Sequence, residues 1–249
     1  MSESKAIGGR TVYGAAVGIL MLDTCFPRVL GDVGHAMTWP FPVLYRVVHG
    51  ATGESVTTAR PDDSSRALVE RFVEAGKDLV RDGADGLATS CGFLSLFQQE
   101  LADRCGVPVA TSSLLQIPLA QALLPAGRRV GVLTFNAQRL TSEHFTAVGA
   151  PSDTPVVGLE TGAEFSRVMT ESAAELDIAA ARRDMVRAAK TLVIEHKNIG
   201  AIVLECTNMG PFARAVQDQT QLPVYDIYTL ITWFHAGLRR RDFVEPTRM

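Results

Sequence analysis

The feature that most constrains this chain is a pair of matching stretches, each an apolar run that ends at a cysteine. The stretches GLATSCGF and AIVLECTN contain Cys91 and Cys206, which stand 115 positions apart. Pro108 and Pro223 keep the same offset, each just ahead of a short apolar segment. An unchanged offset over such a span predicts two duplicated halves, each of which brings one thiol to a shared place.

Apolar segments of strand length alternate with segments of helical periodicity along the chain. Leu68, Phe72, Ala75 and Leu79 recur at spacings of four, three and four, which indicates an amphipathic helix with Ser64 as its N-cap. The expected strands are 15–22, 43–48, 86–89, 107–110, 129–135, 156–159, 201–204 and 224–226. Besides the helix after Ser64, helices are expected at 93–104, 114–124, 138–148, from 163, through 185–196, at 211–219 and up to about 238. The alternation predicts an α/β fold with a mainly parallel sheet in each half.

The expected architecture is two pseudo-symmetric lobes, each with a sheet flanked by helices, and an active site in the cleft between them. The segment VGVL at 130–133 matches VGIL at 17–20 at an offset of 113, so the repeat differs by two residues of loop. We place the N-terminal lobe at 12–116 and the C-terminal lobe at 117–227, and expect the C-terminal helix within 228–245 to pack back on the first lobe.

Composition excludes several classes of function. A net charge of −3 provides no basic surface for nucleic acid or an anionic membrane. The longest apolar run, at 14–22, is too short to span a bilayer and is interpreted as a buried strand. Four cysteines without a CxxC pair and five histidines without HxH or HExxH spacing predict no metal site. The segment GDVG at 31–34 is not GxGxxG, which disfavours dinucleotide binding. Free thiols fit a reducing cytoplasm.

The two cysteines occupy the place where parallel α/β sheets bind ligands, outside the carboxyl ends of the strands. A thiol at a helix N-terminus is expected to favour the thiolate, which can act as a general base while an opposing thiol acts as an acid. The same amides can hold a carboxylate or an enolate-like intermediate without a cofactor. A single cysteine at a strand end is usually a core residue, but two at matched positions favour function. Cys105 is interpreted as structural. Cys25 stands in the long loop after the first strand and could reach a site, although a structural role is favoured.

This pattern resembles the aspartate/glutamate/hydantoin racemase superfamily, from about Val17 to Leu238. The resemblance implies two facing α/β lobes and a cysteine from each as acid or base on opposite faces of a carbon next to a carboxylate or carbonyl. The first motif departs from the Cys-Asn-Thr run of amino-acid racemases, with Gly92 after the cysteine, which argues against aspartate or glutamate as substrate. The N-terminal stretch 18–50 is similar to a branch that includes the algal dimethylsulfoniopropionate lyase.

The candidate catalytic residues are Cys91 and Cys206. Substrate contacts are expected from the residues that flank them and from two loops that follow strands. Thr134 and Asn136 are implied by the resemblance to hold a carboxylate, although a strand end followed by an Asn helix cap explains them equally well. The charged residues of the 23–42 loop are interpreted first as solvent-exposed. Alternatively, Arg28 suits bidentate binding of a carboxylate, and Asp23 or Asp32 suits a cationic group of the substrate. The expected substrate-binding residues are Asp23, Arg28, Ser90, Gly92, Thr134, Asn136, Thr207 and Asn208.

The leading hypothesis is a cofactor-independent racemase or epimerase that removes and returns a proton next to a carboxylate. A lyase of the same superfamily is the alternative, in which a leaving group departs from the neighbouring carbon. A catalytically idle small-molecule binding protein is the third. The expected partner is a small carboxylate, with no nucleic acid and no membrane. The family often forms oligomers, which leaves a homo-oligomer open, although no residue pattern demands one.

Overall fold

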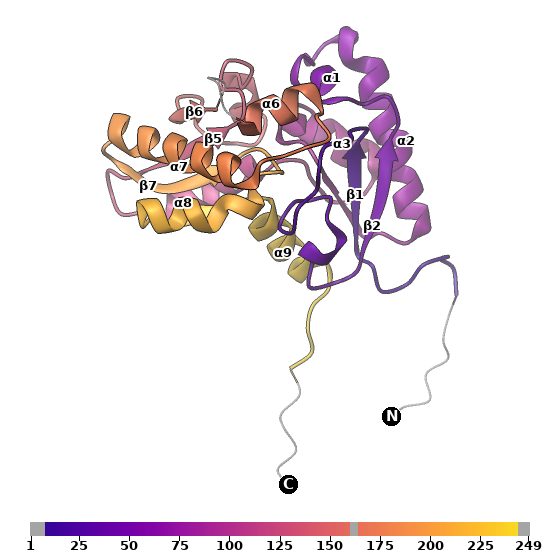
Figure 1. Ribbon diagram of the computed structural model, residues 1–249. Helices are drawn as coiled ribbons and strands as arrows, with labels where there is room; N and C mark the ends of the chain where they lie inside the picture. The colour runs from indigo at the N-terminus through magenta and orange to yellow at the C-terminus, as the bar shows by residue number, and fades with distance from the viewer. Residues whose placement is uncertain (1–7, 160–163, 244–249) are drawn as a thin grey trace.

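The computed structural model describes residues 8–159 and 164–243, which form two lobes that lie side by side (Figure 1). Each lobe holds a four-stranded parallel sheet, ordered β2-β1-β3-β4 in the first and β6-β5-β7-β8 in the second. The identical strand order is what a duplicated half requires. The strands are β1 (Val17–Leu22), β2 (Val43–Val48), β3 (Gly86–Thr89), β4 (Val109–Ala110), β5 (Arg129–Thr134), β6 (Val156–Gly158), β7 (Ile199–Leu204) and β8 (Val224–Tyr225).

The helices flank these sheets and include several short 3₁₀ segments. The α-helices are α1 (Gly53–Thr57), α2 (Arg66–Asp82), α3 (Gln98–Cys105), α4 (Ile117–Leu123), α5 (Ser142–Thr146), α6 (Glu164–Glu171), α7 (Ile178–Glu195), α8 (Ala213–Thr220) and α9 (Ile227–Leu238). The 3₁₀ segments are η1 (Ala36–Thr38), η2 (Asp63–Ser65), η3 (Gly92–Phe97), η4 (Ser113–Gln116) and η5 (Gly210–Phe212).

Three expectations for the helices are corrected by the structure. No helix is among those expected between the strand at 43–48 and Ser64, but this stretch contains α1, whose start is stabilised by a reciprocal cap between Thr52 and Ser55. The helices expected at 93–104, 114–124 and 211–219 begin as the 3₁₀ segments η3, η4 and η5, which tighten the chain after the preceding strands. The helix expected at 138–148 is only α5, and the start expected at Ala163 lies outside the described residues.

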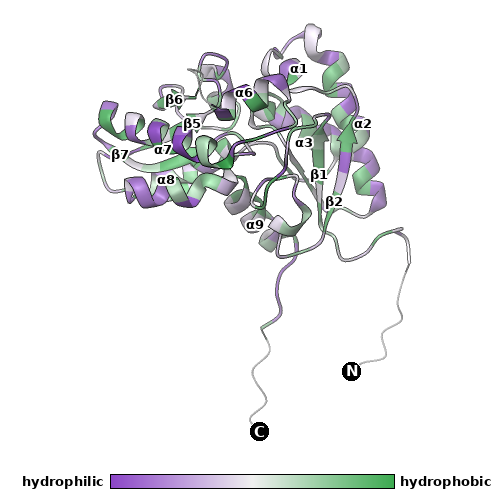
Figure 2. Cartoon of the chain, in the orientation of Figure 1, coloured by the Kyte–Doolittle hydropathy of each residue, from purple (hydrophilic) through white to green (hydrophobic). Residues whose placement is uncertain are grey.

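The central strands are buried and the outer helix faces are polar. All six residues of β1 and all six of β7 are buried, as expected for parallel strands covered on both faces. Hydropathy follows the same division, with apolar strands inside and hydrophilic outer faces on α7 and α8 (Figure 2). Within the described residues, no helix has both the length and the apolar character needed to cross a membrane.

The repeat extends to the packing of helix on sheet. A Cβ atom at Gly18 of β1 would lie 3.0 Å from Leu79 of α2, and one at Gly131 of β5 would lie 2.8 Å from Leu192 of α7. Both glycines therefore let the long helix of each lobe approach its central strand closely. These matched positions keep the two sheets in equivalent places relative to their helices.

Helix α9 packs on the first sheet although it follows the second. Its residues Ile227 and Ile231 share a core cluster with Val17, Ile19 and Ala88 of the first lobe. Asp226 is the N-cap of this helix, and its side chain accepts a hydrogen bond from the backbone N–H of Thr229. Within the segment 228–245 it ends at Leu238, residues 239–243 have no regular structure, and 244–249 lie outside the described residues.

The loop between β1 and β2 joins the two lobes. A Cβ atom at Gly210 of η5 would lie 2.4 Å from the carbonyl oxygen of Gly31, so the loop and the second lobe touch backbone to backbone. Trp39 anchors the loop because its indole donates to the hydroxyl of Tyr45, 2.9 Å away. That hydroxyl in turn donates to the carbonyl of Val33.

Candidate functional site

Cys91 and Cys206 line the same cavity, which lies where β3 of the first lobe and β7 of the second both end. The cavity has a volume of about 40 Å³. Its lining is mixed, with two thiols, one arginine, one carboxyl group and several aromatic and aliphatic side chains. The lining residues are Leu22, Thr24, Phe26, Arg28, Gly53, Thr57, Ser90, Cys91, Gly92, Phe93, Phe135, Met169, Glu205, Cys206 and Asn208.

A hydrogen bond between the lobes holds the two cysteine segments together. The hydroxyl of Thr207 donates to the carbonyl of Ser90, at 2.7 Å, and both residues are buried. The Ser90 hydroxyl in turn accepts from the backbone N–H of Leu22, at 2.8 Å. The residues next to the two thiols thus fix the ends of three elements relative to one another.

Thr207→Val should destabilise the protein by about 1–3 kcal/mol, because it removes a buried hydrogen bond with little change in shape. For a chain of this size that corresponds to a fall in melting temperature of roughly 2–4 °C per kcal/mol. Differential scanning calorimetry measures the shift, with Thr146→Val as the control, since that hydroxyl bonds only within its own exposed helix turn. Equal melting temperatures for the two variants would show that the bond between the lobes contributes nothing.

The thiol of Cys206 belongs to a hydrogen-bonded chain that crosses from one lobe to the other. Its S–H donates to the amide oxygen of Asn208 at 3.4 Å. The amide nitrogen of Asn208 donates to Asp32 at 2.7 Å, and Asp32 also accepts from Arg28 at 3.0 Å. Since an amide oxygen only accepts, this chain holds Cys206 as a neutral thiol whose proton points at the Asn208 oxygen.

Arg28 is the cationic side chain of the described cavity lining. Its guanidinium lies 4.3 Å from the ring centroid of Phe26 and donates to Thr24 and to Asp32. A guanidinium carries five N–H donors, of which these two bonds use two. Arg28 is therefore held in place on one side and still has donors for a ligand carboxylate.

Glu205 contributes a carboxyl group that is wholly buried between the cysteine segments. Its Oε2 accepts from the hydroxyl of Thr134 at 2.7 Å, whereas its Oε1 has no hydrogen-bond partner. Burial raises the pKa of Glu205 to about 7, because the charged form loses its hydration. This carboxyl group therefore changes its charge near neutral pH.

Gly92 provides the space that the Glu205 side chain occupies. A Cβ atom at Gly92 would lie 2.2 Å from Oε1 and 2.5 Å from the carbonyl oxygen of Glu205. Since real Cβ atoms do not approach oxygen this closely, any side chain at position 92 is incompatible with the observed position of Glu205.

The electrostatics correct the expectation that helix N-termini favour thiolates here. Burial, followed by the negative charge of Glu205, raises the pKa of Cys91 to about 12 and that of Cys206 well above the usual thiol range. The backbone N–H groups of Phe93 and Asn208 act in the opposite direction but are outweighed. The free protein therefore holds two neutral thiols. A short 3₁₀ turn has fewer aligned peptide dipoles than an α-helix, so desolvation dominates.

The remaining expected site residues lie at different distances from the cavity. Thr134 is buried and reaches the site only through Glu205. Asn136 accepts from the backbone of Arg139, as a cap would, and is not among the lining residues. Asp23 is half-exposed, accepts from the backbone of Gly50, and also stands outside the lining. The other five, Arg28, Ser90, Gly92, Thr207 and Asn208, lie at the cavity or in its cysteine segments.

Sequence reasoning missed Glu205 and the aromatic lining. Glu205 stands directly before the second cysteine, so a carboxylate at the end of an otherwise apolar strand was an available signal. Phe93 and Phe135 lie edge to face with centroids 5.7 Å apart, and both line the cavity. Cys25 and Cys105 are not among the lining residues: Cys25 is exposed and bonds Ser172, and Cys105 is buried in the hydrophobic core.

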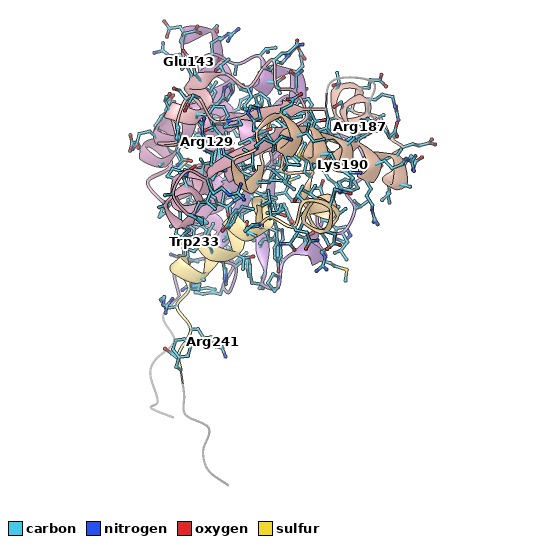
Figure 3. The ribbon with its side chains drawn as sticks, turned by 90° about the vertical axis from the view of Figure 1, so that its left-hand side faces the viewer. Arg129, Glu143, Arg187, Lys190, Trp233 and Arg241 are labelled. Carbon is cyan, nitrogen blue, oxygen red and sulfur yellow. The ribbon has the colours of Figure 1, made fainter. Side chains whose placement is uncertain are left out.

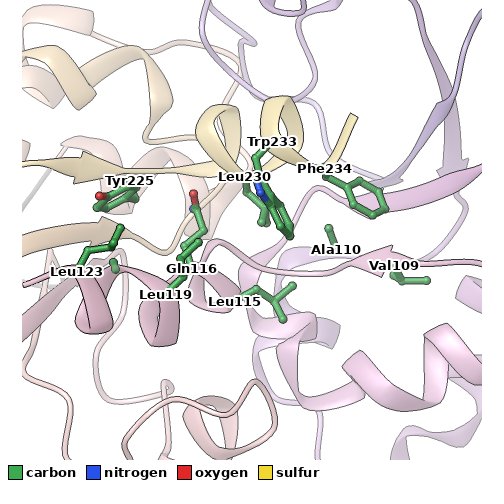
Figure 4. Close-up of a pocket in the computed structure, with 11 residues that line it drawn as sticks. Val109, Ala110, Leu115, Gln116, Leu119, Leu123, Tyr225, Leu230, Trp233 and Phe234 are labelled. Carbon is green, nitrogen blue, oxygen red and sulfur yellow. The ribbon is translucent and has the colours of Figure 1, made fainter. Parts of the chain in front are cut away.

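A larger cavity of about 470 Å³ lies between α4 and α9 (Figure 4). Its lining includes Leu119, Leu123 and Trp233, and no thiol, carboxyl group or imidazole among the described residues. The one amide in it, Gln116, is already bonded to the carbonyl of Asp226. Trp233 lies at the surface of the lobe, on the helix that leads to Arg241 (Figure 3). Among the described residues that line this cavity, the phenol of Tyr225 is the only titratable side chain, so the cavity offers no acid–base pair.

Comparisons with known proteins give one group of sequence relatives. No family model matches the chain. It is 32% identical over 234 residues to dimethylsulfoniopropionate lyase 6 of Emiliania huxleyi (strain CCMP1516), covering 90% of this chain and 60% of that protein. It is 30% identical over 230 residues to the dimethylsulfoniopropionate lyase of Durusdinium sp. clade D, covering 90% of this chain and 75% of that protein. The chain thus spans about three fifths of the length of the first of these relatives.

Solved structures share the fold at low sequence identity. Unliganded arylmalonate decarboxylase matches with a TM-score of 0.56 and 18% identity, covering 90% of this chain and 92% of the other. Glutamate racemase from Francisella tularensis subsp. tularensis SCHU S4, in complex with D-glutamate, matches with a TM-score of 0.52 and 14% identity, covering 92% and 85%. These two-lobed enzymes carry the same arrangement of sheets and helices.

Proposed function

Since this chain belongs to the dimethylsulfoniopropionate lyase family, within the aspartate/glutamate/hydantoin racemase superfamily, we propose that it is a lyase. It takes a proton from the carbon next to a carboxylate and expels a leaving group from the neighbouring carbon. The substrate is dimethylsulfoniopropionate or a compact zwitterion like it. The observation that carries the proposal is the cavity in which a thiol from each lobe meets Arg28.

Arg28 binds the substrate carboxylate in this proposal. The guanidinium is fixed by Phe26, Thr24 and Asp32, so little side-chain entropy remains to be lost on binding. Carboxylate binding also withdraws electron density from the adjacent carbon, which makes its proton easier to remove. The cavity is small, so we expect the loop that carries Arg28 to move outward when the substrate binds.

Cys91 acts as the base and Cys206 as the neutral partner. The charge of Arg28 and the N–H of Phe93 both lower the pKa of Cys91 in part, whereas the S–H of Cys206 is already donated to Asn208. A cationic group of the substrate offsets the burial and the charge of Glu205 that keep the Cys91 thiol neutral in the free protein. The thiolate thus forms in the presence of substrate.

The elimination balances without an added reactant. The Cys91 thiolate accepts the proton of the carbon next to the carboxylate, and the electron pair of that C–H bond forms the carbon–carbon double bond. The bond from the neighbouring carbon to the sulfonium sulfur breaks, and the sulfur leaves with that electron pair as neutral dimethyl sulfide. Acrylate remains, and the proton stays on Cys91, which is thereby returned to the neutral thiol of the free protein. That proton is lost to solvent when the next substrate binds and the thiolate forms again.

We expect the purified protein to release dimethyl sulfide from dimethylsulfoniopropionate, measured in the headspace by gas chromatography. Acrylate, followed by proton NMR, should appear in equal amount, because the proposed step forms both from one molecule. Boiled protein is the control for spontaneous elimination at alkaline pH. Absence of both products at high enzyme and substrate concentrations would exclude this substrate.

A racemase or epimerase is the second candidate, because thiols from two lobes line one cavity. Such an enzyme takes a proton on one face of the carbon and returns one on the other. Incubation with chiral α-substituted carboxylates in D₂O separates the candidates. Deuterium exchange with inversion supports racemisation, and elimination without exchange supports the lyase. Binding measured as thermal stabilisation, with neither reaction, would point to an idle binding protein.

A further inference from the structure

The unpaired oxygen of Glu205 is the feature of the cavity that the proposed elimination leaves unused. Oε1 has no hydrogen-bond partner although the residue is completely buried. A buried polar atom without a partner costs free energy, and such atoms are rare in folded proteins. The absence of a side chain at Gly92 leaves the space that Oε1 of Glu205 occupies. The chain therefore keeps a costly carboxyl oxygen at the surface of its thiol cavity.

The groups around Glu205 leave its charge without a protein counter-charge. Arg28, the cation of the described lining, is already paired with Asp32. Cys91 and Cys206 are the titratable groups that face Glu205 from the two lobes, and both are neutral thiols. His144 packs edge-on against Phe93 behind the cavity, and burial lowers its pKa to about 4, so it is neutral too.

A sulfonium group suits this surrounding better than an ammonium group does. A trialkyl sulfonium is a permanent cation with no N–H to donate, so it needs a nearby negative charge and apolar or aromatic surface rather than several acceptors. The cavity offers one free carboxyl oxygen together with Phe93, Phe135 and Met169. A primary ammonium would leave two of its three donors unsatisfied against the same surface.

Resting on the proposed function, we propose that Glu205 is the specificity-determining residue that binds the cationic sulfonium group of the substrate, while Arg28 binds its carboxylate. The two charged ends of the substrate are then recognised by one residue from each lobe. Since a neutral substrate of the same shape gains nothing from Glu205, this residue selects for the zwitterion.

The assignment couples substrate binding to proton release. Glu205 has a pKa near 7 in the free protein, and a bound cation favours its ionised form. Below pH 7 the carboxyl group must therefore lose a proton when the sulfonium binds, so the affinity weakens by up to tenfold per pH unit. Above about pH 8 the affinity should be constant, because Glu205 is then ionised in the free protein.

The experiment compares the binding of two molecules of nearly equal shape by titration calorimetry. One is dimethylsulfoniopropionate and the other is 4-methylpentanoate, in which a CH group replaces the sulfonium sulfur. Cys91→Ser is used as the background so that the substrate is not consumed. At pH 8 we expect the sulfonium to bind at least about tenfold more tightly than its carbon isostere. Adding Glu205→Gln should bring the ratio to about one and leave the affinity of the isostere within about threefold.

Three results would overturn the assignment: equal affinities for the two molecules in the Cys91→Ser background, a preference for the sulfonium that survives Glu205→Gln, or an equal loss of both ligands. Thr134→Val in the same background provides an independent variant, since it keeps the carboxyl group and removes the hydrogen bond to Oε2. It should keep the preference at pH 9 and move the midpoint of the pH dependence upward, because that bond favours the ionised form. An unmoved midpoint would also contradict the proposal.

Failure of the proposed function gives a different pattern. A wild-type protein that releases no dimethyl sulfide but prefers the sulfonium through Glu205 would keep the binding assignment and exclude the lyase. A protein that releases dimethyl sulfide with the same KM and kcat after Glu205→Gln would keep the lyase and exclude the role of Glu205.

Discussion

Cys91→Ser should lower the rate of dimethyl sulfide release by about 10²- to 10⁴-fold, the range in which a positioned general base contributes. Serine fits the same space, but its hydroxyl is far less acidic than a thiol and does not ionise beside Glu205. Cys91 lies at the cavity and packs only at the edge of the hydrophobic core as a partly buried residue, so a serine of nearly the same size should disturb that packing little. The variant should therefore fold normally and bind substrate, with the loss confined to kcat.

Two further cysteine variants test whether the lower rate of dimethyl sulfide release comes from the loss of the base Cys91. Cys25→Ser replaces an exposed thiol that bonds Ser172 and does not line the cavity, and it should leave the rate unchanged. Cys206→Ser should cost less than Cys91→Ser in an elimination, which needs one base, and as much in a racemisation, which needs both thiols. Wild-type rates for Cys91→Ser would remove the cysteine mechanism altogether.

Gly92→Ala should abolish activity and destabilise the fold, because the new methyl group would meet both the carboxyl group and the backbone carbonyl of Glu205. Overpacking of a dense interior typically costs 1–3 kcal/mol, and a clash with backbone belongs at the upper end, about 3 kcal/mol. The melting temperature should then fall by roughly 6–12 °C, at 2–4 °C for each kcal/mol. Calorimetry and the headspace assay measure the two effects.

Gly237→Ala is the control for this prediction. Nothing lies within 4 Å of a Cβ atom at Gly237, which stands in the last turn of α9, so alanine there should be neutral or slightly stabilising. Adding Glu205→Ala to Gly92→Ala should restore only part of the stability, since the clash with the backbone oxygen remains. Full stability and activity in Gly92→Ala would mean that the segment after Cys91 moves freely.

The sequence predicted the sheets well because buried parallel strands are apolar throughout. The strand expected at 86–89 matches the buried β3 residue for residue, and the strand expected at 43–48 matches β2, an edge strand in which only Val48 is buried. The equal offset of the cysteines predicted a shared place for two thiols, and both line one cavity. The short helix α1 was missed because five residues with a glycine at the start show no helical periodicity.

The chemistry of the site was harder to predict than its position. The thiols were expected to ionise at helix N-termini, but their pKa values are set mainly by burial, which depends on how the two lobes close. Glu205 and Gly92 are 113 positions apart in the sequence, and neither is unusual by itself. Their relation exists only across the interface, so no local pattern in either half could have indicated it.

The hydrogen bonds that run from Arg28 through Asp32 and Asn208 to Cys206 connect the two lobes at the cavity. Asp32 belongs to the first lobe and Asn208 to the second, and they are joined at 2.7 Å. If the loop that carries Arg28 moves outward to admit a substrate, this bond breaks and the amide that accepts the S–H of Cys206 is released. Entry to the cavity and the hydrogen bonding of the Cys206 thiol are therefore coupled through this one contact between the lobes.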